Sequence, residues 1–585
     1  MAASTAATEP PPPTLPPPFA TPEHAANQGA APPPAVDSML VDPEKGGDGL
    51  STQDEDKEEE PDFATGLKLV VLMTSLLLCQ FLVALDIASP QSIIATAIPK
   101  ITNEFHSLDQ VGWYGSGFLL TLAGFVSLWG KAFKHANIKW VFLTSIVIFE
   151  LGSLICGTYP AFAEPTTKWR RGVSKNSTTL IVGRAIQGFG GAGMTSGVYL
   201  IVSVSAVQKL VPGLLGLLSG IFSVASVVGP LLGGAFTDRL TFYINLIIGA
   251  PSILFLIVFY QPPRHHKIER IGWKEFILTL DLPGVALILA SLTCFILALE
   301  YGGATKPWNS GTVIGLLVAF GVLAILFIVL EVYQGDRALL VGRLMKRRTI
   351  VACAFFVAMI NFSFFPLAYN LPIYFQAVNG VSPLASGIRL LPTILPMTLF
   401  SLVSAPGIVL VGWYQPWLMT GAAVAAIGSG LVYMLGIDSS KAHWIGYQIV
   451  AGIGTGLAMQ PPVIIANAIT PKEDNSMAMS NVLFFQFIGG TFGISMAQSI
   501  FSNGLINSLP ELAPGVPVAE VLNIGAFDLQ QVFSGDALLG VLKAYMAGLH
   551  NAWIMSIAGA SVAVFVPLIG AYRKLPKTPP KTWDY

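Results

Sequence analysis

The chain has 585 residues, of which 53% are apolar and only 11% are charged, whereas an ordinary soluble domain carries roughly 25% charged residues. A soluble protein of this length could not bury so much apolar surface, so we expect a membrane protein, and the long apolar segments described below predict that it is all-α. The formal net charge of -1 gives no reason to expect a nucleic-acid partner.

The first 64 residues differ from the rest of the chain. They contain three proline runs and an acidic cluster over 54–60. Such a segment cannot form an apolar core, and it lacks the basic start and apolar middle of a cleaved signal peptide. We predict a disordered cytoplasmic tail.

Fourteen apolar segments of about 20 residues follow, a length that matches a hydrocarbon core of about 30 Å. An even number of spans places both termini on one side of the bilayer. The predicted spans are centred on Leu77, Leu120, Ile148, Gly190, Val224, Phe255, Leu289, Ala319, Met359, Leu399, Val424, Ile453, Gly489 and Val562.

Basic residues assign the sides, because short cytoplasmic loops are enriched in Lys and Arg. Loops 2–3, 6–7 and 8–9 and the C-terminus are basic, so both termini are predicted to be cytoplasmic and the long loop over 503–550 to be external. Loop 3–4 disagrees, since it should be external and yet holds four basic residues between 168 and 175. The same loop contains Asn176-Ser177-Thr178, an N-glycosylation acceptor if that side is lumenal.

Motifs for enzymes and nucleotide-driven pumps are missing from the sequence. It has no G-x-x-x-x-G-K-[ST], no H-E-x-x-H, no G-x-S-x-G on a strand-turn-helix pattern and no insertion large enough for a catalytic domain. The four cysteines lie in apolar runs without CxxC spacing. We therefore expect no enzyme, no metal site and no cofactor.

The fifth span has an unusual composition. The stretch 220–234 is uncharged but contains a proline and four glycines, which permit close helix approach and a bend in a bilayer. We interpret it as a hinge helix; the alternative is a tightly packed helix of no special role. The residues concerned are Gly220, Gly229, Pro230, Gly233 and Gly234.

This stretch resembles the antiporter signature of the major facilitator superfamily: a glycine, eight residues, Gly-Pro, two residues and Gly-Gly on the fifth helix of exporters. Further motifs are similar to the fourteen-span drug:proton antiporter branch and its fungal toxin and multidrug efflux pumps. They are Leu85-Asp86 followed by Ile93 to Pro99, Leu371 to Gln376, Ser386 to Pro392, and Gly452 to Gly456 through Gln460. The stretch Thr179 to Gly193, which contains Arg184, resembles the fourth-helix motif of the superfamily as a whole.

The resemblance implies a major facilitator fold with two six-helix bundles and two extra central helices. A bundle over 65–262 would precede a loop and spans seven and eight over 263–335, a second bundle over 336–573 and a cytoplasmic tail over 574–585. A mid-membrane cavity would open to each side in turn as the bundles rock. We expect a monomer.

Three charged residues lie inside predicted spans one, three and four: Asp86, Glu150 and Arg184. A charge there costs at least about 2.5–3.5 kcal/mol, so these side chains should face the protein interior and find partners. We hypothesise that Asp86 or Glu150 binds a proton, that Arg184 modulates it, and that the proton gradient drives transport. The alternative is a static buried ion pair that fixes helix register.

Aromatic and amide side chains in spans nine, twelve and thirteen are candidates for substrate contacts. Apolar walls with a few polar groups suit a small hydrophobic or amphipathic molecule. For each amide, hydrogen bonding between helices is the alternative. The candidates are Asn361, Phe365, Tyr369, Gln376, Gln460, Asn467 and Gln486.

The sequence departs from the family pattern in three places. Residues 88–91 add slightly more than one turn after Asp86, residues 161–175 extend loop 3–4, and Phe242 follows Thr241 without the usual Trp-Arg-Trp run. These differences indicate either errors in the gene model or an impaired, diverged transporter.

The leading hypothesis is a proton-coupled efflux transporter in the cell membrane, which exports a secondary metabolite, toxin or drug. Its partners would be a small-molecule substrate, protons and the lipid bilayer. A transporter of basic amino acids in the vacuolar membrane and a non-transporting membrane sensor or impaired relative are the alternatives.

Overall fold

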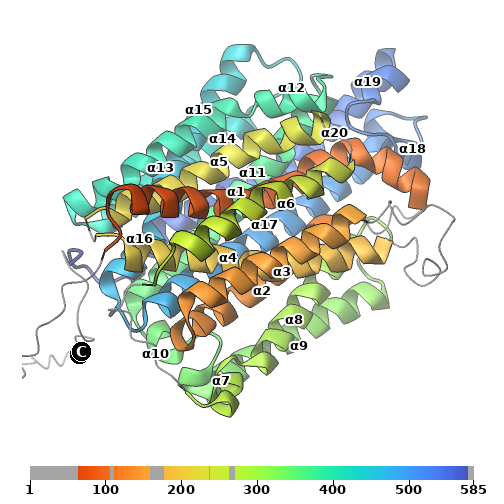
Figure 1. The fold of residues 1–585 in the computed structure, drawn as a ribbon. Coiled ribbons are helices and arrows are strands. Elements are labelled where there is room, and N and C mark those ends of the chain that lie inside the picture. Colours follow the sequence, from red (N-terminus) through yellow and green to blue (C-terminus); the bar gives the residue numbers. More distant parts are fainter. Residues whose placement is uncertain are drawn as a thin grey trace, which may run out of the picture. The chain divides into compact units, whose positions relative to one another are not determined.

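Helices build the part of the chain that the computed structural model describes, which comprises residues 63–105, 111–158, 177–207, 209–235, 238–262 and 271–576 (Figure 1). All of these residues belong to one unit of the chain, 59–585. Helices satisfy every backbone polar group within one segment, which a bilayer requires. Residues 1–62, the loop insertion at 161–175 and Asn176 lie outside the described residues.

The first half of the unit contains six long helices. They are α1 (Gly66–Phe105), α2 (Val111–His135), α3 (Ile138–Thr158), α4 (Ser177–Ser205), α5 (Val211–Ala235) and α6 (Asp238–Phe259). The helix α1 continues through 88–91 without a break.

Short elements and a helical pair link this half to the next. They are α7 (Trp273–Thr279), α8 (Leu282–Tyr301), α9 (Gly311–Gln334), the 3-10 turn η4 (Gly335–Arg337) and α10 (Gly342–Met345). We call α7, α8 and α9 the connecting hairpin.

The second half contains α11 (Arg348–Ala377), α12 (Pro383–Ile388), α13 (Leu391–Val411), α14 (Tyr414–Tyr433), α15 (Lys441–Met459), α16 (Pro461–Ile469), α17 (Asn475–Leu512), α18 (Val518–Asn523), α19 (Leu529–Val532), α20 (Gly535–Phe565) and the 3-10 turn η5 (Val566–Ile569).

The number of long apolar helices is consistent with the predicted fourteen spans. Eleven segments of the described chain are long and apolar enough to cross a bilayer. The helices α4, α5 and α6 add 29, 25 and 22 residues, and a helix of about 20 residues suffices for one crossing.

The two halves repeat one packing pattern. In the first, α1 packs on α5 and α6, and α4 packs on α2 and α3; in the second, α11 packs on α17 and α20, and α15 packs on α13 and α14. The halves meet through α2 against α17 and α5 against α13, which occupy equivalent places in the repeat. The arrangement is two six-helix bundles related by a repeat, as expected for the predicted fold.

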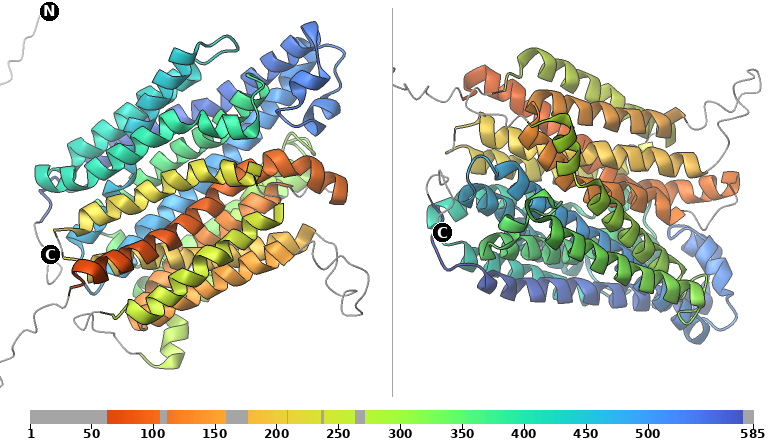
Figure 2. Two further views of the ribbon diagram at one scale, coloured as in Figure 1. Left: turned by 45° about the horizontal axis from the view of Figure 1, so that its top comes forward. Right: turned by 90° about the horizontal axis from the view of Figure 1, so that it is seen from below.

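The connecting hairpin lies across the junction of the bundles. In the right-hand view of Figure 2 the orange and yellow helices of the first half and the blue helices of the second lie on opposite sides of it. Leu289 of α8 packs on Gly124 of α2, whereas the ring of Phe295 lies 4.4 Å from that of Phe492 on α17. The hairpin therefore touches both bundles.

One predicted loop is shorter than expected. The sequence predicts an external loop over 503–550, but α17 continues to Leu512 and α20 begins at Gly535, so 513–534 form the connection, including α18 and α19. The physical reason is an apolar cluster beyond the predicted spans. Leu505 and Leu509, one turn apart, are buried in it with Val541 and Tyr545.

Close backbone contact between α3 and α4 depends on glycine. A Cβ atom on Gly190 would meet the backbone of Phe149, and one on Gly152 would meet the backbone of Gln187. Small residues at such crossings let helices approach closely in a membrane, where van der Waals packing supplies much of the association energy. This crossing also fixes the position of α4 along the axis of α3.

We predict that Gly190→Ala lowers the stability of the protein by about 1–3 kcal/mol, the usual cost of overpacking. The control is Gly321→Ala on α9, where a Cβ atom would meet nothing within 4 Å. Thermal unfolding in detergent measures both. A melting temperature of Gly190→Ala equal to that of Gly321→Ala would contradict the close crossing.

Candidate functional site

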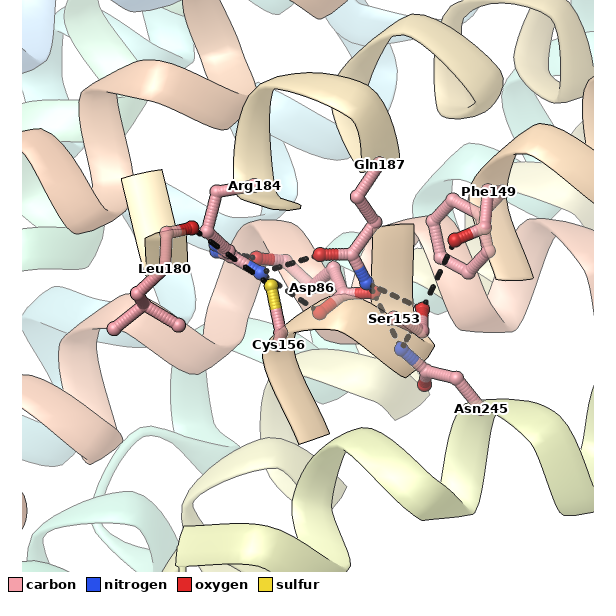
Figure 3. A network of polar contacts seen from close by, with 8 residues as sticks. All are labelled: Asp86, Phe149, Ser153, Cys156, Leu180, Arg184, Gln187 and Asn245. Carbon is pink, nitrogen blue, oxygen red and sulfur yellow. Dashed lines mark hydrogen bonds and ion pairs between the residues drawn. The ribbon is translucent and has the colours of Figure 1, made fainter. Parts of the chain in front are cut away.

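A buried ion pair joins α1 and α4 (Figure 3). Nη1 of Arg184 lies 2.9 Å from Oδ1 of Asp86, and Nη2 donates to the backbone carbonyl of Asp86 at 3.0 Å. Both residues are 3% exposed. The guanidinium also lies 5.0 Å from the ring centre of Phe118 on α2. The structure thus brings together two of the three charged residues that the sequence indicates.

Two amides complete the surroundings of Asp86. Gln187 of α4 and Asn245 of α6 both donate to Oδ2, the latter at 2.8 Å. The same two amides donate to Oγ of Ser153 on α3, at 2.8 and 3.1 Å, and Ser153 donates to the carbonyl of Phe149. Nη1 of Arg184 also donates to Oε1 of Gln187 at 3.2 Å. We call Asp86, Ser153, Arg184, Gln187 and Asn245 the polar network.

The donors around Asp86 match an ionised carboxylate. Its side chain accepts hydrogen bonds from Arg184, Gln187 and Asn245, and hydrogen bonds to a charged group are stronger than those to a neutral one. The network draws on α1, α3, α4 and α6, all of them in the first bundle. It therefore holds one bundle together and does not cross to the other.

Glu150 lies beside the network but outside it. It is one turn before Ser153 on α3, and its carboxyl group lies over Gly249 of α6. Both carboxylate oxygens are buried and have no hydrogen-bond partner among the described residues. An ionised carboxylate without donors is costly to bury, whereas a neutral acid costs far less. The chemistry of Glu150 thus differs from that of Asp86.

Sequence reasoning missed Ser153, Gln187 and Asn245. Charged residues stand out in an apolar span, but serines and amides are frequent there and do not reveal which charge they contact. One signal was available for Gln187, which is three residues after Arg184 and so on the same face of α4.

The glycine-rich stretch lies between the polar network and the second bundle. It occupies the second part of α5, which packs along α1. Ala225 is buried against Ala84 and Leu85, next to Asp86. On the other side a Cβ atom on Gly220 would lie 3.2 Å from Thr398 of α13. Gly229 is buried, and Pro230, Gly233 and Gly234 follow in the same helix.

Three of the substrate candidates hold neighbouring elements in place. Gln376 donates to Ser386 of α12 at 3.1 Å, and Gln460 donates to the carbonyl of Leu215 on α5 at 3.1 Å. Asn467 accepts from Asn475 at 2.7 Å. These contacts fit the alternative interpretation, hydrogen bonding between helices.

The other four candidates lie on α11 and α17. Asn361 is buried and donates to Val357 on its own helix, and its Oδ1 has no partner among the described residues. Phe365 is buried against Gly490 of α17, whereas Tyr369 and Gln486 are half-buried. Contact of these residues with a substrate stays a prediction.

The bundles meet through polar contacts at the end that carries Lys134, which we call the basic end. Oγ of Ser196 on α4 lies 2.6 Å from Oγ of Ser480 on α17. Lys134 of α2 lies 3.2 Å from Asp474, which precedes α17, and Asn475 donates to Ser203 at 3.0 Å. The bundles are thus closed against each other at the basic end.

Comparisons with known proteins agree with this architecture. Residues 76–494 match the model of the Major Facilitator Superfamily. The chain is 40% identical over 532 residues to an MFS-type efflux pump of Trichophyton rubrum, covering 89% of this chain and 96% of that protein. It is 37% identical over 538 residues to the dehydrocurvularin exporter of Aspergillus terreus, covering 91% of each.

A solved structure resembles the fold at low sequence identity. The human organic anion transporter MFSD10 aligns with a TM-score of 0.54 and 13% identity, covering 86% of this chain and 100% of that one. This likeness concerns the fold alone. The family model and the relatives show that the chain belongs to the Major Facilitator Superfamily of membrane transporters.

We predict that Arg184→Met destabilises the protein by about 3–5 kcal/mol, because it leaves the Asp86 carboxylate buried without its counter-charge. In an Asp86→Asn background the same change should cost much less. Thermal unfolding of the four proteins of this double-mutant cycle gives the coupling. Additive effects would contradict a direct ion pair.

Proposed function

We propose that this protein is a proton-coupled transporter that exports a small hydrophobic or amphipathic compound by alternating access. Support for export comes from relatives over nine-tenths of the chain that are named efflux pumps or exporters. Those names favour export over the vacuolar uptake of amino acids and over a sensor. A secondary metabolite, toxin or drug is the proposed cargo class.

The contrast between two carboxyl groups carries the coupling proposal. Asp86 is surrounded by donors, whereas Glu150 has none among the described residues. In this conformation the transported proton would reside on Glu150 while Asp86 stays ionised against Arg184. Movement of α1 or α4 during the cycle would loosen the ion pair and let Asp86 exchange a proton with its surroundings.

The contacts at the basic end indicate which side of the membrane is closed in this conformation. Lys131, Lys134 and Arg343 gather there, and basic loops face the cytoplasm, so we assign the basic end to the cytoplasmic side of the cell membrane. Both termini would then be cytoplasmic. Cargo would enter once the contacts of Ser196 with Ser480 and of Lys134 with Asp474 separate.

The experiment is accumulation of labelled dehydrocurvularin and of a fluorescent lipophilic dye in pump-deficient yeast that express the protein, with and without a proton uncoupler. Lower accumulation that the uncoupler reverses supports proton-coupled export. Equal accumulation with and without the protein, for every compound of a broader amphipathic panel, would contradict it.

Two carboxyl variants test the assignment of the proton. Asp86→Asn and Glu150→Gln should each abolish uncoupler-sensitive export while the protein remains in the membrane. The control is Glu520→Gln on α18, an exposed carboxylate that should leave export unchanged. Full export by Glu150→Gln would remove Glu150 from the mechanism.

A further inference from the structure

A buried lysine fastens α2 to the connecting hairpin. Lys131 is 1% exposed, although the sequence predicts it in a cytoplasmic loop. Its Nζ donates to the carbonyl of Thr279, the last residue of α7, at 2.8 Å and to that of Arg337 in η4 at 2.6 Å. One ammonium group thus holds both ends of the α8–α9 pair.

Two acidic side chains at the ends of the α8–α9 pair hold the start of the linker to the second bundle. Asp281 precedes α8, and Glu331 lies in the last turn of α9. Asp281 accepts from the amide of Leu339 at 2.9 Å and from Gln334 at 2.7 Å. Glu331 accepts from the amide of Leu340 at 2.7 Å. We call Lys131, Asp281, Glu331 and Gln334 the lysine junction.

The backbone conformation of Asp281 is held in place by the contacts of the lysine junction. Asp281 has φ of 49°, the one positive value found for a residue other than glycine in the described chain. Such a conformation is uncommon for a residue other than glycine and persists where the surroundings hold it. Here the side chain caps α8 through the amide of Gly284 at 3.0 Å and is 1% exposed.

A second lysine on the same helix has different partners. Lys134, three residues after Lys131, reaches Asp474 of the second bundle, and Arg343 reaches the same carboxylate at 2.7 Å. Opening the basic end must separate Lys134 from Asp474, because they belong to different bundles. Nothing in that movement requires Lys131 to leave the lysine junction.

We infer that the lysine junction fixes the connecting hairpin to the first bundle throughout the transport cycle. The hairpin and residues 335–340 then move with α2, and the linker after Val341 is the hinge of the second bundle. Lys131 is a positioning residue in this scheme. The contact of Phe295 with Phe492 on α17 breaks when the second bundle moves. The inference rests on the rocking of the bundles proposed above.

Disulfide cross-linking of cysteine pairs tests this inference. The four native cysteines, Cys79, Cys156, Cys294 and Cys353, are free and are first replaced by alanine in the full chain. Three pairs follow: Ser196→Cys with Ser480→Cys reports closure of the basic end, Gly124→Cys with Leu289→Cys joins α2 to α8, and Phe295→Cys with Phe492→Cys joins α8 to α17. Membranes are oxidised at acidic and neutral pH, with and without dehydrocurvularin.

We expect the cross-linking yields of the Ser196–Ser480 pair and the Phe295–Phe492 pair to change together when the pH or the added compound changes. The α2–α8 pair should cross-link fully under every condition. An α2–α8 pair that varies, or an α8–α17 pair that stays constant while the first pair varies, would overturn the inference and leave the rocking intact. A first pair that never varies would overturn both.

Lys131→Met and its matched control Lys134→Met identify the residue responsible. Lys131→Met should make α2–α8 cross-linking incomplete and dependent on conditions, whereas Lys134→Met should leave it complete. Should Lys131→Met fail to reach the membrane, Gln334→Ala weakens the same junction with no change of charge and should loosen the same pair. Unchanged α2–α8 cross-linking in every junction variant would overturn the role of Lys131.

Discussion

The ion pair of Asp86 and Arg184 is the interaction on which the first bundle depends. A charge in a bilayer is costly, and the pair is tolerated because α3, α4 and α6 bring Ser153, Gln187 and Asn245 to the same point. Removal of either charge would leave the other buried and unpaired. The packing of the four helices therefore depends on the charge of Asp86, and that charge is tolerated only because of the packing.

Contacts within a bundle differ in kind from contacts between bundles. Within the first bundle the polar contacts form a closed network around a buried charge. Across the junction they are a serine pair, an amide to a serine hydroxyl, an amide to a backbone carbonyl and an ion pair. Each of the neutral contacts is worth about 0.5–1.5 kcal/mol. The bundles can therefore separate without disruption of the polar network inside the first bundle, which alternating access requires.

The sequence predicts the spans and the charged pair because both stand out from an apolar background. It also predicts a hinge or a close helix contact in α5, since glycine and proline are concentrated there. Three features could not be predicted from the sequence. The amides around Asp86 resemble any other amide in a span, Lys131 resembles a loop lysine although it is buried, and α17 extends past its apolar stretch because Leu505 and Leu509 find tertiary partners. In each case the missing information is which distant segment lies opposite.

The insertion after Asp86 illustrates the same point. Relative to the family pattern it adds residues 88–91, slightly more than one helical turn just after Asp86. The helix α1 continues through these residues, and Asp86 lies against Arg184. The extra turn therefore follows the polar network and does not displace it.

The most direct measurement of the central claim is proton movement driven by cargo alone. Purified protein is placed in liposomes that contain a pH-sensitive dye, and a gradient of a compound that the protein exports from yeast is imposed without any pH gradient. We predict proton flux opposite to the cargo in the wild type and none in Asp86→Asn. Cargo movement without proton flux in the wild type, or equal proton flux in Asp86→Asn, would contradict it.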